Sequence, residues 1–273
     1  MATTHFTINT AIPPRHHPSA SSARRVASGL APLLALYAIY SMVRWFVSDR
    51  GPVAGGLHAR SILDLERWLR IDWELGIQRA VLPYSWLIFA ANWYYVYGFL
   101  PVVIGCAVLG AWKAPLAFAW WRRVFAISLT IALIGFAVYP LTPPRLLPAA
   151  YGYIDTLLHF GPRYYGDATG SSLFNLYGSI PSTVNVYAAM PSMHVAWSVI
   201  AAALFWAVAR RRRWATVIAI VHPSLMALAV IATANHYVID VVAGLTVLLA
   251  AICLARLWTH RLARQTAATV SRA

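Results

Sequence analysis

Long apolar stretches separated by short polar or basic segments dominate the chain. Six of them are long enough, or nearly so, to cross a bilayer core, which takes roughly 20 mostly apolar residues per helix. They lie at residues 30–47, 84–111, 122–140, 193–209, 214–233 and 237–257. The first has no small-residue cleavage site, so we interpret it as a retained helix rather than a signal peptide. The pattern predicts an all-α, polytopic membrane protein with six transmembrane helices.

Composition excludes several other classes of protein. Of 273 residues, 60% are apolar and only 11% are charged, against roughly a quarter charged in soluble domains. Two cysteines are too few for a disulfide-rich secreted protein, and both lie inside apolar stretches. We therefore expect Cys106 and Cys253 to be thiols buried in the membrane region.

The net charge of +14 is unevenly distributed across the predicted membrane. Six spans place both chain ends on one side, and that side carries basic residues and no acidic ones. These are Arg15, Arg24, Arg25, Lys113, Arg122, Arg123, Arg210, Arg211, Arg212, Arg213, Arg256, Arg261, Arg264 and Arg272. Basic and acidic residues balance on the other side. This positive-inside pattern predicts cytoplasmic termini, and it favours anionic lipid rather than nucleic acid as the partner of the charge.

The polar segments divide the chain into a disordered basic cytoplasmic tail, a membrane domain and a second basic tail. The boundaries are residues 1–28, 29–258 and 259–273. Within the membrane domain, Ser61 would cap an amphipathic helix in an interfacial segment at about 60–80. A long, Tyr-rich outer loop covers about 141–192, and loops of that length are usually functional.

Three junctions at the same predicted depth on the outer side carry unusual polar residues. They are residues 139–145, 190–194 and 233–240. In the third junction, His236 and Asp240 are four residues apart and would share one face of a helix. The carboxylate could then hold one imidazole nitrogen and leave the other as a nucleophile or base. A structural His–Asp pair joining two helices is the alternative.

The other two junctions offer groups that bind an oxyanion. Pro191 suits a first helical turn, Ser192 can cap the helix or bind an anion, and the free N–H groups of that turn attract phosphate. His194 beside them could donate a proton to a departing oxygen. Arg145 follows two prolines, and its guanidinium fits phosphate. Taken singly, His194 is equally an interfacial histidine, and Arg145 a membrane-edge anchor.

Together these residues form a set suited to phosphoryl transfer. A zinc site built from His236, Asp240 and His194 is an alternative, which the neighbouring Arg145 disfavours by repelling a cation. We therefore expect no metal. His222 falls inside the fifth predicted helix, where a hydrogen bond within the bundle is expected.

These junction sequences resemble the motifs of the type 2 phosphatidic acid phosphatase superfamily. The segments similar to its second and third motifs are Pro191-Ser192-Met193-His194 and His236-x-x-x-Asp240. Those closer to its inositol phosphorylceramide synthase-like branch are Pro143-Pro144-Arg145, Asn235-His236-Tyr237-Val238-Ile239-Asp240, Glu74-Leu75-Gly76-Ile77 and Asn92-x-x-Tyr95. The resemblance extends over about residues 62–250.

The resemblance implies a six-helix core and metal-independent chemistry through a phosphohistidine, with no cofactor. His236 would be the nucleophile, Asp240 its orienting partner, and His194 the acid that protonates the leaving group. The phosphate-binding residues would be Arg145, Ser192, Met193 and Asn235.

Departures from the phosphatase pattern bear on the reaction. Val138 replaces a Lys, Ala229 and Val230 replace a Ser-Arg pair, and Phe99 stands where the branch usually has a His near Tyr95. The synthase-like branch commonly lacks the Lys and the Ser-Arg pair as well. A single Arg supplies less positive charge than a fully charged phosphomonoester needs. These departures tilt the prediction toward a lipid phosphotransferase.

The expected substrate is a phospholipid, a polyprenyl phosphate or a ceramide-like lipid, with inositol or another alcohol as acceptor. With water as acceptor, the enzyme would instead be a lipid phosphate or polyprenyl diphosphate phosphatase. A non-catalytic lipid-binding or transport protein is the alternative of a different class. The site would lie on the extracytoplasmic or luminal side.

Overall fold

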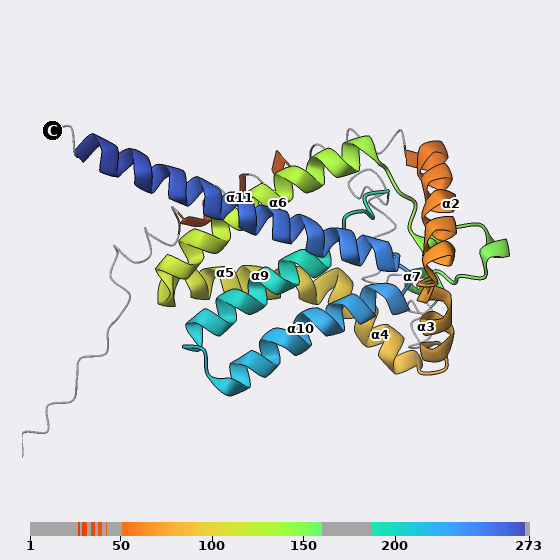
Figure 1. The fold of residues 1–273 in the computed structure, drawn as a ribbon. Helices are drawn as coiled ribbons and strands as arrows, with labels where there is room; N and C mark the ends of the chain where they lie inside the picture. Colours follow the sequence, from red (N-terminus) through yellow and green to blue (C-terminus); the bar gives the residue numbers. More distant parts are fainter. Residues whose placement is uncertain are drawn as a thin grey trace, which may run out of the picture.

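The computed structural model describes residues 51–159 and 187–270, together with scattered helical positions between 27 and 42. Over these residues the chain is helical, and its one β-bridge joins Leu141 to Ala188. The elements are α2 (Gly51–Leu69), α3 (Glu74–Val81), α4 (Ser85–Trp93), η2 (Tyr94–Gly98), α5 (Phe99–Lys113), α6 (Pro115–Val138), η3 (Pro144–Leu146), η4 (Ala149–Tyr151), α7 (Thr156–His159), α9 (Met193–Val208), α10 (Arg213–Ala232) and α11 (Val238–Val270) (Figure 1).

Four helices in the described part are long and apolar enough to cross a membrane. They are Ser85–Lys113, Pro115–Val138, Arg213–Ala232 and Val238–Arg261. Helix α9 is also apolar but has only 16 residues. These helices indicate a membrane protein. The predicted span at 30–47 and the tail at 1–28 fall largely outside the described residues, so the count of six spans stays a prediction.

Helix α9 is the central element of the bundle. It lies among α5, α6, α10 and α11, and most of its side chains are buried (Figure 1). Small residues on α9 and its neighbours permit this close packing. At Gly110 of α5, an added Cβ would lie 3.0 Å from Leu204 of α9. By contrast, α10 presents exposed Val217, Ile220 and Leu225, as expected of a face toward lipid.

Helices α2 and α3 lie across one end of the bundle, where α10 ends and α9 and α11 begin (Figure 1). The expected cap at Ser61 is wrong, because α2 begins at Gly51 and the Ser61 hydroxyl donates within the helix to the Leu57 carbonyl. The buried face of α2, including Ile62 and Leu63, packs with Tyr237 rather than only resting on an interface. α11 continues as helix into the predicted C-terminal tail.

Candidate functional site

The predicted histidine–aspartate pair lies where α11 begins, with His236 in the link from α10 and Asp240 in the first turn of α11. Nδ1 of His236 lies 3.3 Å from Oδ2 of Asp240, and both side chains are buried. The same carboxylate oxygen accepts the backbone N–H of Tyr237 at 3.0 Å. Nε2 of His236 is buried and has no hydrogen-bond partner within the described residues. The pair thus leaves one imidazole nitrogen available for chemistry.

Helix α9 begins directly beside this pair. The backbone N–H of Ser192 donates to the Asp240 carbonyl at 2.9 Å. One turn along α11, a Cβ at Gly244 would collide with the Ser192 carbonyl, so only glycine permits this approach. Ser192 occupies the N-cap position without a side-chain cap bond, and its buried hydroxyl finds no partner in the described chain. Met193, the first residue of α9, is buried as well.

His194 faces His236 across the start of α9. Their ring centroids are 5.7 Å apart. On its other sides the His194 ring stacks on Tyr95, with centroids 4.4 Å apart, and meets Phe99 at 4.8 Å. The two aromatic residues come from the π-helical turn η2 and the residue that follows it. Such turns interrupt long helices and are frequent at functional sites.

Arg145 reaches the same end of the bundle from the 3₁₀ turn η3. Its backbone N–H donates to the Ala234 carbonyl at 2.9 Å, and its Nε donates to Oδ1 of Asn235 at 2.9 Å. Its Nη1 donates to Oδ2 of Asp155 at 2.7 Å in a largely buried ion pair. The three predicted junctions therefore meet. Asp155, however, carried no signal in the sequence, and it already compensates the charge of the arginine.

A model of the PAP2 superfamily matches residues 60–254, which is more than half of the chain and includes all three junctions. The chain belongs to the PAP2 superfamily. Comparisons with curated proteins and with solved structures gave no match. Membership fits an enzyme that acts on lipid-linked phosphate, a lipid phosphatase or phosphotransferase.

Two further acidic residues of this PAP2 protein were missed as site residues. Oε1 of Glu74 accepts the backbone N–H of Val238 at 2.6 Å, and Oε1 of Glu66 accepts that of Ile239 at 2.8 Å. Both carboxylates are fully buried. The first N–H groups of a helix have no partner within it, so α2 and α3 cap α11 from outside. The start of α11 is therefore occupied by carboxylates and unsuited to phosphate. The one sequence feature that pointed to either residue was the place of Glu74 in the segment Glu74-Leu75-Gly76-Ile77, which resembles the synthase-like branch.

The buried pair titrates abnormally. The pKa of Glu66 is raised to about 9, mainly by burial; the nearby charges of Glu74 and Asp240 contribute to the rise, and the hydrogen bond from Ile239 opposes it. Burial likewise raises the pKa of Glu74. Two adjacent buried carboxylates cannot both ionise cheaply. At neutral pH the pair therefore holds a proton.

Tyr237 joins the first and third junctions of the PAP2 site. Its buried hydroxyl donates to the Thr142 carbonyl at 3.0 Å. Burial, followed by the charge of Asp240, raises the pKa of Tyr237, so it stays a neutral donor. Sequence reasoning did not assign this tyrosine a role, although it lies between the two residues of the His–Asp pair.

Two other sequence predictions concern groups near the site. The expected bundle contact of His222 is confirmed, since its Nε2 lies 2.5 Å from the Tyr94 hydroxyl. Regarding metals, no three His, Cys, Asp or Glu side chains in the described part of the chain are placed to hold one ion.

Proposed function

We propose that this PAP2 superfamily member is a lipid phosphotransferase of the inositol phosphorylceramide synthase-like type. It would move a substituted phosphoryl group from a phosphodiester lipid to an alcohol through a phosphohistidine. Two observations carry the proposal. Among the described residues, Nε2 of His236 has no partner, and the one cation brought to it there is Arg145, which is already paired with Asp155.

In the first step, Nε2 of neutral His236 attacks phosphorus. A nitrogen–phosphorus bond forms and the bond to the leaving oxygen breaks, while His194 gives that oxygen a proton. Asp240 keeps Nδ1 protonated by accepting its hydrogen bond, which leaves the lone pair on Nε2. This covalent route replaces one difficult displacement by two easier ones.

In the second step, the acceptor alcohol attacks the phosphohistidine. His194, now deprotonated, removes the hydroxyl proton, the new oxygen–phosphorus bond forms, and the bond to Nε2 breaks. General acid–base catalysis of this kind contributes about 10²–10⁴-fold. The Tyr95 ring stacked on His194 limits the orientations that the imidazole can adopt.

The start of α9 supplies the phosphate cradle. Its free N–H groups and dipole favour an anion, and the unpartnered Ser192 hydroxyl can donate to a phosphoryl oxygen. Arg145, held by Asn235, supplies the positive charge, and preorganised donors of this kind stabilise the developing charge.

Charge balance favours a diester donor over a monoester. A phosphodiester carries one negative charge, whereas a monoester carries nearly two at neutral pH. Arg145, the arginine that the described part of the chain brings to the site, is offset by Asp155. Val138, Ala229 and Val230 stand where the superfamily's phosphatases have further polar or cationic groups. A lipid phosphate or polyprenyl diphosphate phosphatase is the second candidate, and superfamily membership supports it.

The charge distribution supports an orientation for the site. We infer cytoplasmic termini and an active site on the extracytoplasmic or luminal side, because the excess basic residues follow the positive-inside pattern. The proposed membrane domain extends over residues 29–258.

The test uses purified protein, chelator and three donors: phosphatidylinositol with ceramide or diacylglycerol as acceptor, phosphatidic acid, and a polyprenyl diphosphate. Mass spectrometry reads the products beside His236→Ala, with His222→Ala, a half-buried histidine within the bundle, as the control. A new phosphodiester that requires the acceptor and His236 supports the transferase. Free phosphate without acceptor indicates the phosphatase. Loss of all turnover in chelator, or full turnover in His236→Ala, contradicts the phosphohistidine.

A further inference from the structure

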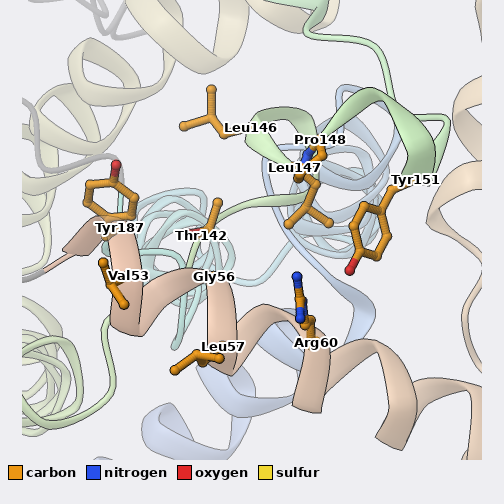
Figure 2. A pocket seen from close by; sticks show the side chains of 10 residues that line it. All are labelled: Val53, Gly56, Leu57, Arg60, Thr142, Leu146, Leu147, Pro148, Tyr151 and Tyr187. Atoms are coloured by element: carbon orange, nitrogen blue, oxygen red, sulfur yellow. The ribbon is translucent and has the colours of Figure 1, made fainter.

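A pocket of about 340 Å³ lies between α2 and the segment that follows α6 (Figure 2). This size is within the range of small-ligand sites. One side is a single face of α2, and the other is formed mainly by residues 142–151, the segment that includes the turns η3 and η4. The lining residues are Val53, Gly56, Leu57, Arg60, Thr142, Leu146, Leu147, Pro148, Tyr151 and Tyr187.

The pocket combines one cation with hydroxyl donors and apolar walls. Figure 2 shows the Arg60 guanidinium and the Tyr151 hydroxyl directed into the same space from opposite sides. Arg60 has no hydrogen bond or ion pair with any residue that the structure describes. The buried Thr142 hydroxyl is also without a partner in that part of the chain. Leu57 and Leu147 supply apolar surface beside these groups.

The segment 142–148 separates this pocket from the phosphohistidine site. Leu146 and Leu147 face the pocket, whereas the neighbouring Arg145 extends to Asn235 and Asp155. Likewise, the Thr142 carbonyl holds the Tyr237 hydroxyl on the side of the catalytic pair. A ligand in the pocket would therefore contact the same segment, residues 142–148, that positions Arg145 on its other side.

We propose that this pocket binds the phosphate headgroup of an intact membrane phospholipid, as a site distinct from the one in which lipid is consumed. Arg60 would hold the phosphate, because a guanidinium presents a fork of donors that matches its oxygens. The Tyr151 hydroxyl would donate to the headgroup, and Leu57, Leu147 and Val53 would cover the start of an acyl chain. A lipid fits better than a free anion, since half of the lining is apolar.

The test measures binding rather than turnover, so its failure is distinguishable from failure of the proposed function. Isothermal titration calorimetry measures the binding of water-soluble dihexanoyl phosphatidylglycerol to the detergent-purified protein and to its His236→Ala variant. Two variants address the pocket itself. Arg60→Gln removes the cation, and Gly56→Leu fills the pocket, where an added Cβ meets nothing within 4 Å. Arg67→Gln, two turns along the same helix, is the matched control because Arg67 does not line the pocket.

We expect saturable binding in wild type and in His236→Ala. Arg60→Gln should weaken it about tenfold, the loss expected for one charge-assisted hydrogen bond. Gly56→Leu should weaken it too, and Arg67→Gln should leave it unchanged. Three results would overturn the proposal: equal losses in Arg60→Gln and Arg67→Gln, loss of binding in His236→Ala, or displacement of the lipid by inorganic phosphate at similar concentration. The last would indicate a simple anion site.

Discussion

Oδ2 of Asp240 lies 3.3 Å from Nδ1 of His236 and also accepts the backbone N–H of Tyr237 at 3.0 Å. One carboxylate oxygen therefore fixes both the imidazole and the peptide that follows it. The ring cannot turn without losing this partner, and its Nε2 stays directed away from Asp240. The first prediction follows from this arrangement.

Asp240→Asn should lower the rate of phosphoryl transfer by about 10²–10⁴-fold while the protein remains folded. Both contacts use the Oδ2 position. An amide oxygen placed there still accepts both hydrogens but lacks the negative charge that holds the imidazole, whereas an NH₂ group placed there favours the tautomer with the proton on Nε2, which is not nucleophilic. Acid-labile phosphohistidine trapped from radiolabelled donor measures the step directly. Unchanged trapping in Asp240→Asn would show that the pair is structural only.

Asp155→Asn should shift preference toward phosphomonoesters. Removing the carboxylate frees the positive charge of Arg145, which is otherwise compensated at 2.7 Å, and a doubly charged substrate gains more from it. We expect the monoester-to-diester ratio of kcat/KM to rise about tenfold. Asp64→Asn is the control, because Asp64 pairs with Arg67 in an exposed ion pair. An equal rise in both variants would mean that overall charge, not Arg145, determines the preference.

Glu66→Gln should reduce the pH dependence of stability. Burial raises the pKa of Glu66 from 4.5 to about 9, so the folded state holds a proton that the unfolded chain releases. The stability that this proton contributes is complete below the pKa of the unfolded chain, 4.5, and is lost as the pH rises through the pKa of the folded protein, about 9. The Tm of the wild type should therefore fall as the pH rises from about 4.5 to about 9. In Glu66→Gln the fall should be smaller.

Some pH dependence should remain in that variant. Glu74 has a raised pKa from the same cause, and Asp240, Tyr153 and Tyr237 are further titratable groups that interact with the pair. Asp64→Asn, with an exposed carboxylate on the same helix, should keep the wild-type profile. A Glu66→Gln protein whose Tm falls as steeply as that of the wild type would show that Glu66 is ionised in the fold.

Gly244→Ala should destabilise the protein and lower activity together. The added methyl group meets the Ser192 backbone, which cannot move without disturbing the start of α9. Overpacking of this kind costs about 1–3 kcal/mol of the free energy of unfolding. Gly105→Ala in α5 is the matched control, because nothing lies within 4 Å of its added Cβ. Thermal unfolding in detergent checks both, and equal Tm values for the two variants would contradict the close contact.

Hydropathy alone predicted the helices that are long and apolar enough to cross a membrane, because a bilayer dictates length and composition. Predicted residues 84–111 correspond to Ser85–Lys113, and 214–233 correspond to Arg213–Ala232. Topology then predicted that junctions distant in sequence share one depth, and Arg145, Asn235 and His236 do meet. These outcomes depend on features that each segment carries by itself.

The parts that escaped prediction depend on tertiary packing. Nothing local distinguishes Glu66, which is buried against α11, from Asp64 two residues earlier, which is exposed. The pairing of Asp155 with Arg145 likewise depends on how the segment after α6 folds back. The early start of α2 at Gly51 was missed because two glycines, Gly55 and Gly56, weaken the helical pattern there. One of them is needed for close contact, since a Cβ at Gly55 would lie 2.8 Å from the Thr142 hydroxyl.

The π-helical turn at Tyr94–Gly98 sets the rotational register of a whole membrane span. Asn92 before it bonds to Thr156, whereas Tyr95 and Phe99 within and after it contact His194. Winding this turn into regular α-helix with all its residues kept would rotate one half of the span against the other by about 100°. Asn92 and Phe99 could not then both keep their partners. The extra residue taken up by this turn is therefore what allows both halves of the helix to reach their partners at once.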